Sequence, residues 1–145
     1  MKVIIFNDNH RYAVNVDHVV EIAKVDSVEE LPNAPDYMLG VANIRGKSLI
    51  VIDVQQKLHG KRTTEDASHV IIVRSGPFIV GLSGNIEKMF EVRGEQLSML
   101  QEIKDEGKQM VRGIFYEAER AVNLLNLEAL IKNINDGFSD NEAHV

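Results

Sequence analysis

The chain has 145 residues, a formal net charge of −6 and no cysteine. This length allows one compact unit or two very small ones, and the lack of cysteine excludes disulfides, a thiolate nucleophile and cysteine-ligated metal sites. The negative charge argues against a nucleic-acid partner, and no apolar run is long enough for a signal-peptide core or a bilayer span, so we expect a cytoplasmic protein without membrane insertion.

The N-terminal region predicts a β-hairpin. Residues 3–6 form a short apolar run, residues 12–16 alternate in polarity, and turn-forming residues lie between them, which is typical of two antiparallel strands. Residues 19–25 mix the helical and strand periods, so both a helical turn and a strand stay open for them. Pro32 and Pro35 exclude a regular helix or a central strand and predict an extended loop.

The middle of the first half predicts two strands and a helix. Residues 39–44 and 49–52 have strand character and flank a turn that contains Gly46. Residues 54–58 are long enough for one short helix, and Gly60 is well placed to end it. We therefore expect the order strand, strand, short helix.

A polar stretch at residues 61–68 forms a natural boundary between two halves. After it, residues 70–73 and 78–82 surround Ser-Gly-Pro and predict a second hairpin. The charged insert at residues 102–108 is expected to be a solvated loop, and the polar end at residues 135–145 is expected to fray.

The second half repeats the first. At an offset of 67 positions, the apolar run 3–6 falls on 70–73. Three further apolar pairs coincide at this offset: Val19 with Ile86, Ile22 with Met89, and Val25 with Val92. Two later segments coincide at an offset of 73: 40–42 with 113–115, and 49–58 with 122–131. Similarity at a fixed offset predicts a duplicated architecture.

We therefore expect an all-β protein built from two related units. Residues 1–66 would form a first β-barrel and residues 67–145 a second, and exchange of strands near the N-terminus between them is left open. Closed barrels are favoured because closure removes exposed strand edges. Each unit is too small to be robust alone, so the two are expected to share apolar surface.

Sequence motifs give no support for catalysis. The chain lacks a dinucleotide-binding fingerprint, a phosphate-binding loop and a nucleophile elbow. The five histidines show no metal-binding spacing, and each is most simply a surface polar residue. The acidic pairs at 29–30 and 65–66 have no nucleophile nearby in the sequence and are expected to serve solubility. No catalytic residue, metal or cofactor is expected.

A cluster of specific residues in the first half carries a family resemblance. The motifs are Val19-Val20-Glu21-Ile22, Pro32-Asn33-Ala34-Pro35, Gly40-Val41-Ala42-Asn43-Ile44-Arg45-Gly46 and Val51-Ile52-Asp53. In this order and spacing they resemble the CheW family of chemotaxis coupling, or adaptor, proteins, over nearly the whole chain. One segment departs from the family pattern, because Ser83-Gly84-Asn85-Ile86 stands where the family usually has Val-Asp-x-Val. Any partner contact or turn made by that aspartate is therefore in doubt.

The resemblance implies a fold and a role. The fold would be two small SH3-like five-stranded β-barrels around a shared hydrophobic core, with short helices. The protein would have no enzymatic activity and would couple the cytoplasmic tips of chemoreceptors to the regulatory domain of a CheA-type histidine kinase. It would be a monomer in isolation and would be recruited to membrane-associated receptor arrays.

The resemblance also implies a set of partner-binding residues. They are Val19, Glu21, Ile22, Gly40, Asn43, Arg45 and Gly46. Each also has a purely structural interpretation: Arg45 could pair with Glu21 to hold its turn, the two glycines could serve bends or positive φ angles, and Asn43 could satisfy turn backbone groups. We expect Glu21 and Arg45 to face each other, and Val19 to be partly exposed.

An apolar groove between the barrels, with Arg45 and Glu21 nearby, is expected to accept the helical hairpin of a receptor tip, while a separate face meets the kinase. Four alternatives remain: the regulatory domain of a CheA-type kinase, which the short length disfavours; a divergent chemosensory pathway with a non-motility output; a small-ligand-binding β-barrel sensor; and a small barrel enzyme.

Overall fold

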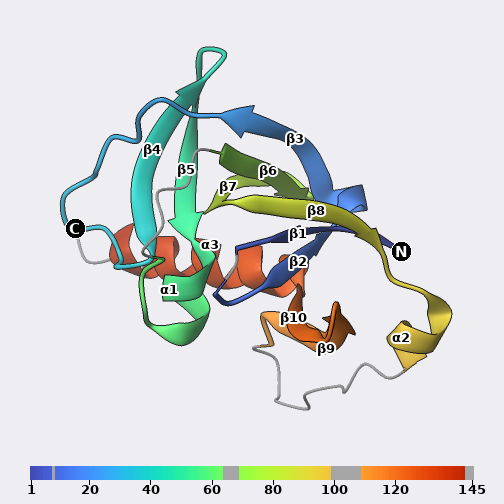
Figure 1. Ribbon diagram of the computed structural model, residues 1–145. Helices are drawn as coiled ribbons and strands as arrows, with labels where there is room; N and C mark the ends of the chain where they lie inside the picture. Colours follow the sequence, from blue (N-terminus) through green and yellow to red (C-terminus); the bar gives the residue numbers. More distant parts are fainter. Residues whose placement is uncertain (8, 64–68, 99–108, 143–145) are drawn as a thin grey trace.

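The computed structural model describes residues 1–7, 9–63, 69–98 and 109–142 (Figure 1). The elements follow in this order: β1 (Lys2–Phe6), β2 (Tyr12–Asn15), the 3-10 turn η1 (Val16–His18), β3 (Val19–Lys24), β4 (Met38–Ile44), β5 (Lys47–Asp53), α1 (Val54–His59), β6 (His69–Ser75), β7 (Phe78–Gly84), β8 (Ile86–Glu91), α2 (Gly94–Ser98), β9 (Val111–Glu117), β10 (Arg120–Leu125) and α3 (Leu127–Glu142). The predicted hairpins and the short helix that Gly60 ends are confirmed. The insert at 102–108 and most of the boundary at 61–68 lie outside the described residues.

The strands form two five-stranded sheets, and the fold is that of paired SH3-like barrels. Sheet A has the order β8-β1-β2-β10-β9, and sheet B has the order β3-β6-β7-β5-β4. Sheet B is continuous in sequence, whereas sheet A combines β1 and β2 with β8, β9 and β10. The expected boundary between residues 66 and 67 divides the sequence repeats, but each sheet contains strands from both sides of it. We refer to the barrels formed by these sheets as barrel A and barrel B.

The strand order combines the last three strands of each repeat with the first hairpin of the other repeat. In barrel B, β3 pairs with β6, and Ile22 lies opposite Ile71. In barrel A, β8 pairs with β1, and Met89 lies opposite Ile4. The two pairs are related by the offset of 67 found in the sequence, so the repeats exchange equivalent strands.

Both exchanged strands contain a β-bulge at the same repeat position. In β3 the pairing skips Val20, which lies between Val19 and Glu21. In β8 the pairing skips Glu87, because Ile5 lies opposite Lys88 and Phe6 opposite Ile86. A bulge bends its strand and changes where the following side chains point.

Apolar side chains form three layers, as expected for two barrels with a shared core. One layer fills barrel A, a second fills barrel B, and the largest lies between the sheets and takes in residues of α3. β6 separates two of these layers, because Ile71 and Val73 face the shared core while Val70 and Ile72 face the interior of barrel B. Burial on this scale supplies the main stabilisation of the fold.

α3 continues to Glu142, so most of the segment 135–145 is helical, and its fraying stays a prediction. The helix begins after a strand and packs Leu130, Ile131 and Ile134 into the shared core. These positions lie on one helical face, so the polar residues between them belong to its solvent side. Figure 1 shows α3 as one long helix, with β6 and β7 above it and the β9–β10 hairpin below it in the view.

Candidate interaction surface

The tip of the β4–β5 hairpin carries the ion pair that the sequence predicted. Arg45 and Gly46 form the two-residue turn with φ angles of 52° and 80°, as in the tight hairpin turns that need positive φ. The Arg45 Nη2 atom lies 3.1 Å from Glu21 Oε2 on β3. Since β3 and β4 are the two edges of sheet B, this pair spans the closing edge of barrel B.

Arg45 remains open to a partner despite this pair. Its side chain is 79% exposed, and that of Glu21 is 28% exposed. An ion pair this exposed adds at most about 1 kcal/mol of stability. The guanidinium has five donors in a planar fork, so most of its binding capacity faces solvent.

Asn43 and Gly40 serve the hairpin itself. The Asn43 side-chain oxygen accepts a hydrogen bond of 3.0 Å from the Gly46 backbone N–H, which is the structural role weighed for it above. Gly40 is buried with a φ of 144°, and a Cβ placed there would lie 2.1 Å from the Glu29 carbonyl oxygen. Glu29 and Val41 exchange backbone hydrogen bonds beside it, so Gly40 allows the segment after β3 to close barrel B.

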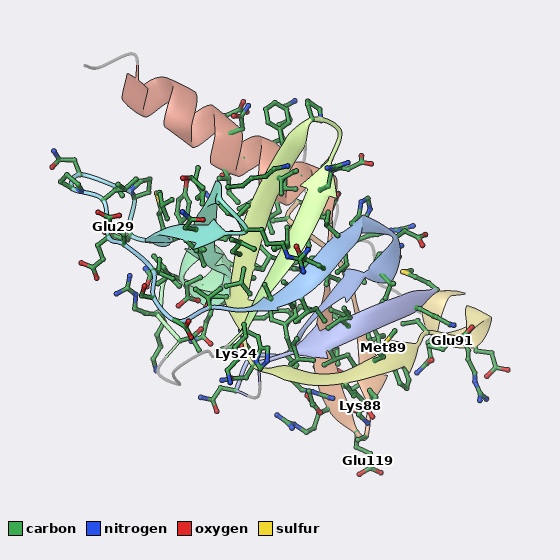
Figure 2. The ribbon with its side chains drawn as sticks, turned by 90° about the horizontal axis from the view of Figure 1, so that it is seen from above. Lys24, Glu29, Lys88, Met89, Glu91 and Glu119 are labelled. Atoms are coloured by element: carbon green, nitrogen blue, oxygen red, sulfur yellow. The ribbon has the colours of Figure 1, made fainter. Side chains whose placement is uncertain are left out.

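An apolar strip lies along the two exchanged strands. Val20 and Ile22 of β3 are exposed, while Val19 is only partly buried against the shared core, as expected. Met89 of β8 is 63% exposed and is the repeat equivalent of Ile22. β3 and β8 are edge strands of sheets B and A, and Figure 2 shows Met89 next to Lys88 on β8. We call Val20, Ile22 and Met89 the apolar strip.

Sequence reasoning did not include Met89 among the site residues, although the offset of 67 already paired it with Ile22. Ile22 and Met89 both neighbour a shared-core residue on the adjacent strand, Ile71 and Ile4 respectively. A shallow depression of about 250 Å³ adjoins Met89, between Lys2, Phe90 and Glu91. The apolar groove itself stays a prediction.

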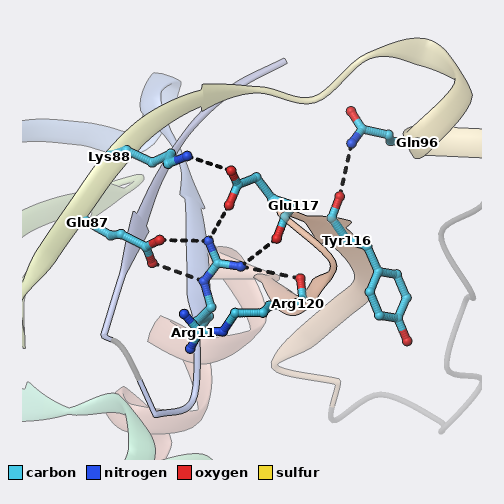
Figure 3. A network of polar contacts seen from close by, with 7 residues as sticks. All are labelled: Arg11, Glu87, Lys88, Gln96, Tyr116, Glu117 and Arg120. Atoms are coloured by element: carbon cyan, nitrogen blue, oxygen red, sulfur yellow. Dashed lines mark hydrogen bonds and ion pairs between the residues drawn. The ribbon is translucent and has the colours of Figure 1, made fainter.

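Barrel A holds a buried polar network that the sequence did not reveal (Figure 3). The Arg11 side chain is 2% exposed and donates through Nε and Nη2 to both oxygens of Glu87, at 3.0 and 2.9 Å. Nη2 also donates to Glu117 Oε1 at 2.6 Å, and Nη1 donates to the carbonyl oxygens of Glu117 and Arg120. Lys88 donates to the second oxygen of Glu117. The hydrogen bonds from Lys88 and then Arg11 hold the pKa of Glu117 below its ordinary value.

His10 and His59 also come together, although each was expected to be an isolated surface residue. Their rings stack with centroids 4.6 Å apart, and the His59 Nδ1 atom lies 2.6 Å from the Tyr12 hydroxyl. Burial and the nearby His10 lower the pKa of His59. In the part of the chain that the structure describes, no group of three or more metal-ligating side chains occurs, so this pair lacks the ligands of a metal site.

Another depression has a volume of about 410 Å³ and lies between the loop before β4 and α1. Its charged lining residues are Glu30, Asp36 and Arg62, and all lining residues come from the first half of the chain. Among the described helices, none is long and apolar enough to cross a membrane.

Comparisons with known proteins agree with this geometry. A family model described as CheW-like domain matches residues 3–135. The chain is 35% identical to a probable chemotaxis protein CheW of Rhizobium etli, over 84% of this chain and 81% of that protein. It is 27% identical to a chemotaxis protein CheW of Klebsiella aerogenes, over 93% and 83% of the two chains. A crystal structure of the scaffolding protein TtCheW from Thermoanaerobacter tengcongensis superposes with a TM-score of 0.73 at 21% identity, over 87% and 84% of the chains.

Proposed function

The chain belongs to the CheW-like domain family, and from this premise we propose that it is a non-enzymatic chemotaxis adaptor that couples receptor tips to a histidine kinase. The kinase would be of the CheA type, bound through its regulatory domain. The receptor would be a chemoreceptor, bound at the cytoplasmic tip of its helical hairpin. The protein itself would be recruited from the cytoplasm to receptor arrays.

The exposed guanidinium of Arg45 is the observation that best supports the kinase contact. Among the described residues it forms an exposed ion pair with Glu21, so a partner carboxylate can compete for the guanidinium at little cost to the fold. Arg45 sits on a rigid two-residue turn fixed by Asn43. A preorganised donor loses little conformational entropy on binding, which favours a specific contact.

The apolar strip supports the receptor contact. Val20, Ile22 and Met89 are exposed apolar side chains from both repeats, and an amphipathic helix buries its apolar face on such a surface. The Arg45 turn adjoins the β3 part of the strip, because Arg45 pairs with Glu21, which lies between Val20 and Ile22. Val19 would contribute from the edge of the shared core.

An adaptor of this kind transmits a signal through binding alone. It changes kinase output if it binds one arrangement of receptor and kinase more tightly than another, and this difference in affinity requires no chemistry. Weak individual contacts suffice when many copies are held in an array.

A divergent chemosensory pathway with a non-motility output is the second candidate. The departure at Ser83-Gly84 favours it, because Gly84 is buried against Phe6 and leaves no space for an aspartate side chain. A Cβ at Gly84 would lie 2.7 Å from the Phe6 ring. The partners would then differ while the binding surfaces stay the same.

Calorimetric titration against a CheA-type regulatory domain and a receptor-tip fragment from the same cell tests the proposal. We expect the unmodified protein to bind both. Arg45→Glu places an acid at the kinase contact and should weaken kinase binding at least about tenfold.

Arg93→Glu is the matched control, since it makes the same charge change at an exposed arginine after β8. It should bind the kinase domain like the unmodified protein. If the unmodified protein binds neither partner, the coupling function is wrong. If both variants weaken binding equally, the effect is one of net charge and Arg45 is not the contact.

A further inference from the structure

We propose that Arg11 is a positioning residue whose buried contact with Glu87 fixes the course of β8 and thereby holds Met89 in the apolar strip. This inference rests on the proposed function, because it concerns the receptor-facing strip. Arg11 itself is buried and cannot touch a partner. It would act through the strand that carries Met89.

The contact between Arg11 and Glu87 lies at the β-bulge of β8. Glu87 is the bulged residue of the strand, and Met89 follows it by two positions. The bend at a bulge depends on how the extra residue is held. Here both carboxylate oxygens of Glu87 are bound by Arg11 in a fork, a geometry that restrains orientation as well as distance.

The same guanidinium joins β8 to the opposite edge of sheet A. β8 is an edge strand, and its ladder is with β1 alone among the described strands. Arg11 also binds the Glu117 carboxylate and the carbonyl oxygens of Glu117 and Arg120, which lie at the β9–β10 turn (Figure 3). Together with the bond from Lys88 to Glu117, the Arg11 side chain therefore ties β8 to the β9–β10 turn of barrel A.

Barrel B shows that the topology does not require this contact. The repeat equivalents of Arg11 and Glu87, at the offset of 67, are Phe78 and Val20. Both are exposed apolar residues, and barrel B forms the same sheet order with them. The Arg11–Glu87 ion pair is thus present in barrel A alone, on β8, the strand that carries Met89.

Glu87→Gln is the main test, because Glu87 is partly exposed and its loss leaves the Arg11–Glu117 contact in place. We expect receptor-tip affinity to fall about tenfold, within the range of coupling through packed networks. Kinase affinity should stay within about twofold, because Arg45 lies in the other barrel. Glu119→Gln removes the same charge at an exposed turn position of barrel A and should change neither affinity.

A methyl-labelled methionine spectrum supplies a readout that a general loss of stability would not produce. In Glu87→Gln the Met89 signal should shift or broaden, while the signal of Met38, buried in barrel B, should stay unchanged. Arg11→Lys is a second variant: it keeps the charge but loses the fork, and should reproduce the Glu87→Gln pattern.

The outcomes separate this inference from the proposed function. Unchanged receptor affinity in Glu87→Gln, or a parallel loss of receptor and kinase binding, overturns the positioning role. If the unmodified protein does not bind the receptor tip, the proposed function fails, and the Met89 signal alone decides: a selective shift supports positioning of β8 by Arg11, and no shift overturns it.

Discussion

The two barrels have equivalent strand orders but are closed by ion pairs of opposite character. In barrel B, the acid Glu21 lies on the exchanged strand and the base Arg45 on the hairpin turn. In barrel A, the equivalent strand position holds Lys88, which binds Glu117 next to the equivalent turn. The signs are reversed, and Glu117 is only 8% exposed.

The difference shows how one scaffold can separate stability from binding. In the barrel A pair the Glu117 carboxylate is buried, and it accepts hydrogen bonds from Arg11 and Lys88 within the chain, so the pair serves the fold. The barrel B pair is exposed and adds little stability, so its arginine is available for a partner. Three of the following tests address this contrast and one addresses the closure of barrel B, from the largest effect to the smallest.

Arg11→Met should be the most destabilising change. It leaves the buried carboxylate of Glu117 with Lys88 as its remaining charged partner and should cost about 3 kcal/mol of unfolding free energy, since breaking a buried pair strands a charge. Urea unfolding followed by circular dichroism measures this. Arg45→Met is the matched change in barrel B and should cost less than about 0.5 kcal/mol. Equal losses would remove the contrast between the barrels.

Gly40→Ala should cause the next largest loss of stability. The new Cβ would meet the Glu29 backbone in a region of φ that alanine avoids, for a loss of about 2 kcal/mol. Gly46→Ala meets nothing within 4 Å, so only the φ strain of about 1 kcal/mol should remain. If the Gly40→Ala protein is as stable as the original but binds the kinase more weakly, Gly40 contacts the partner and is not needed for packing.

Acid should weaken barrel A through Glu117. Its folded pKa lies below the ordinary value of 4.5, because Lys88 and Arg11 bind the ionised form. The unfolded chain therefore takes up a proton first, so the stability from this group is present above pH 4.5 and is lost as the pH falls through the lowered folded pKa. Unfolding titrations from pH 6 to pH 3 should show the difference between the original and Glu117→Gln shrinking with acid. Glu119→Gln should show no such trend.

Arg45→Gly should have the smallest effect on stability, and of opposite sign. Arg45 adopts a φ of 52°, which glycine tolerates better, so the variant should gain up to about 0.5 kcal/mol. Kinase affinity should nevertheless fall as in Arg45→Glu. A stable variant that keeps full kinase binding would contradict the role of the guanidinium.

The repeats in the sequence predicted most strands, because each strand needs only local apolar patterning and turn residues. The offsets of 67 and 73 relate β3 to β8, β4 to β9 and β5 to β10. Which strands pair with one another could not be predicted. Equivalent strands have similar apolar patterns, so these patterns fit pairing within a repeat as well as pairing between repeats. The Glu21–Arg45 pair could be predicted because both residues belong to the family motifs, and the structure confirms it.

Arg11 could not be predicted from the sequence. It follows turn residues and has the ordinary appearance of a surface arginine, while its partners Glu87 and Glu117 lie 76 and 106 positions away. Long-range polar contacts leave no periodic signal in a single sequence. The length of α3 was missed for a related reason, because its later apolar positions are sparse and the polar residues between them dominate the composition.

The order of strands also decides when each sheet can form during synthesis. All strands of sheet B lie between Val19 and Gly84, so its hydrogen-bonded ladder is available once residue 84 has left the ribosome. β1 and β2 are made first, yet their partner strands β8 and β10 come later, and β10 is complete only at Leu125. At about 5 to 20 residues per second, the wait for β10 lasts about 5 to 20 seconds. The nascent chain therefore carries an unpaired, strongly apolar N-terminal hairpin through much of its translation.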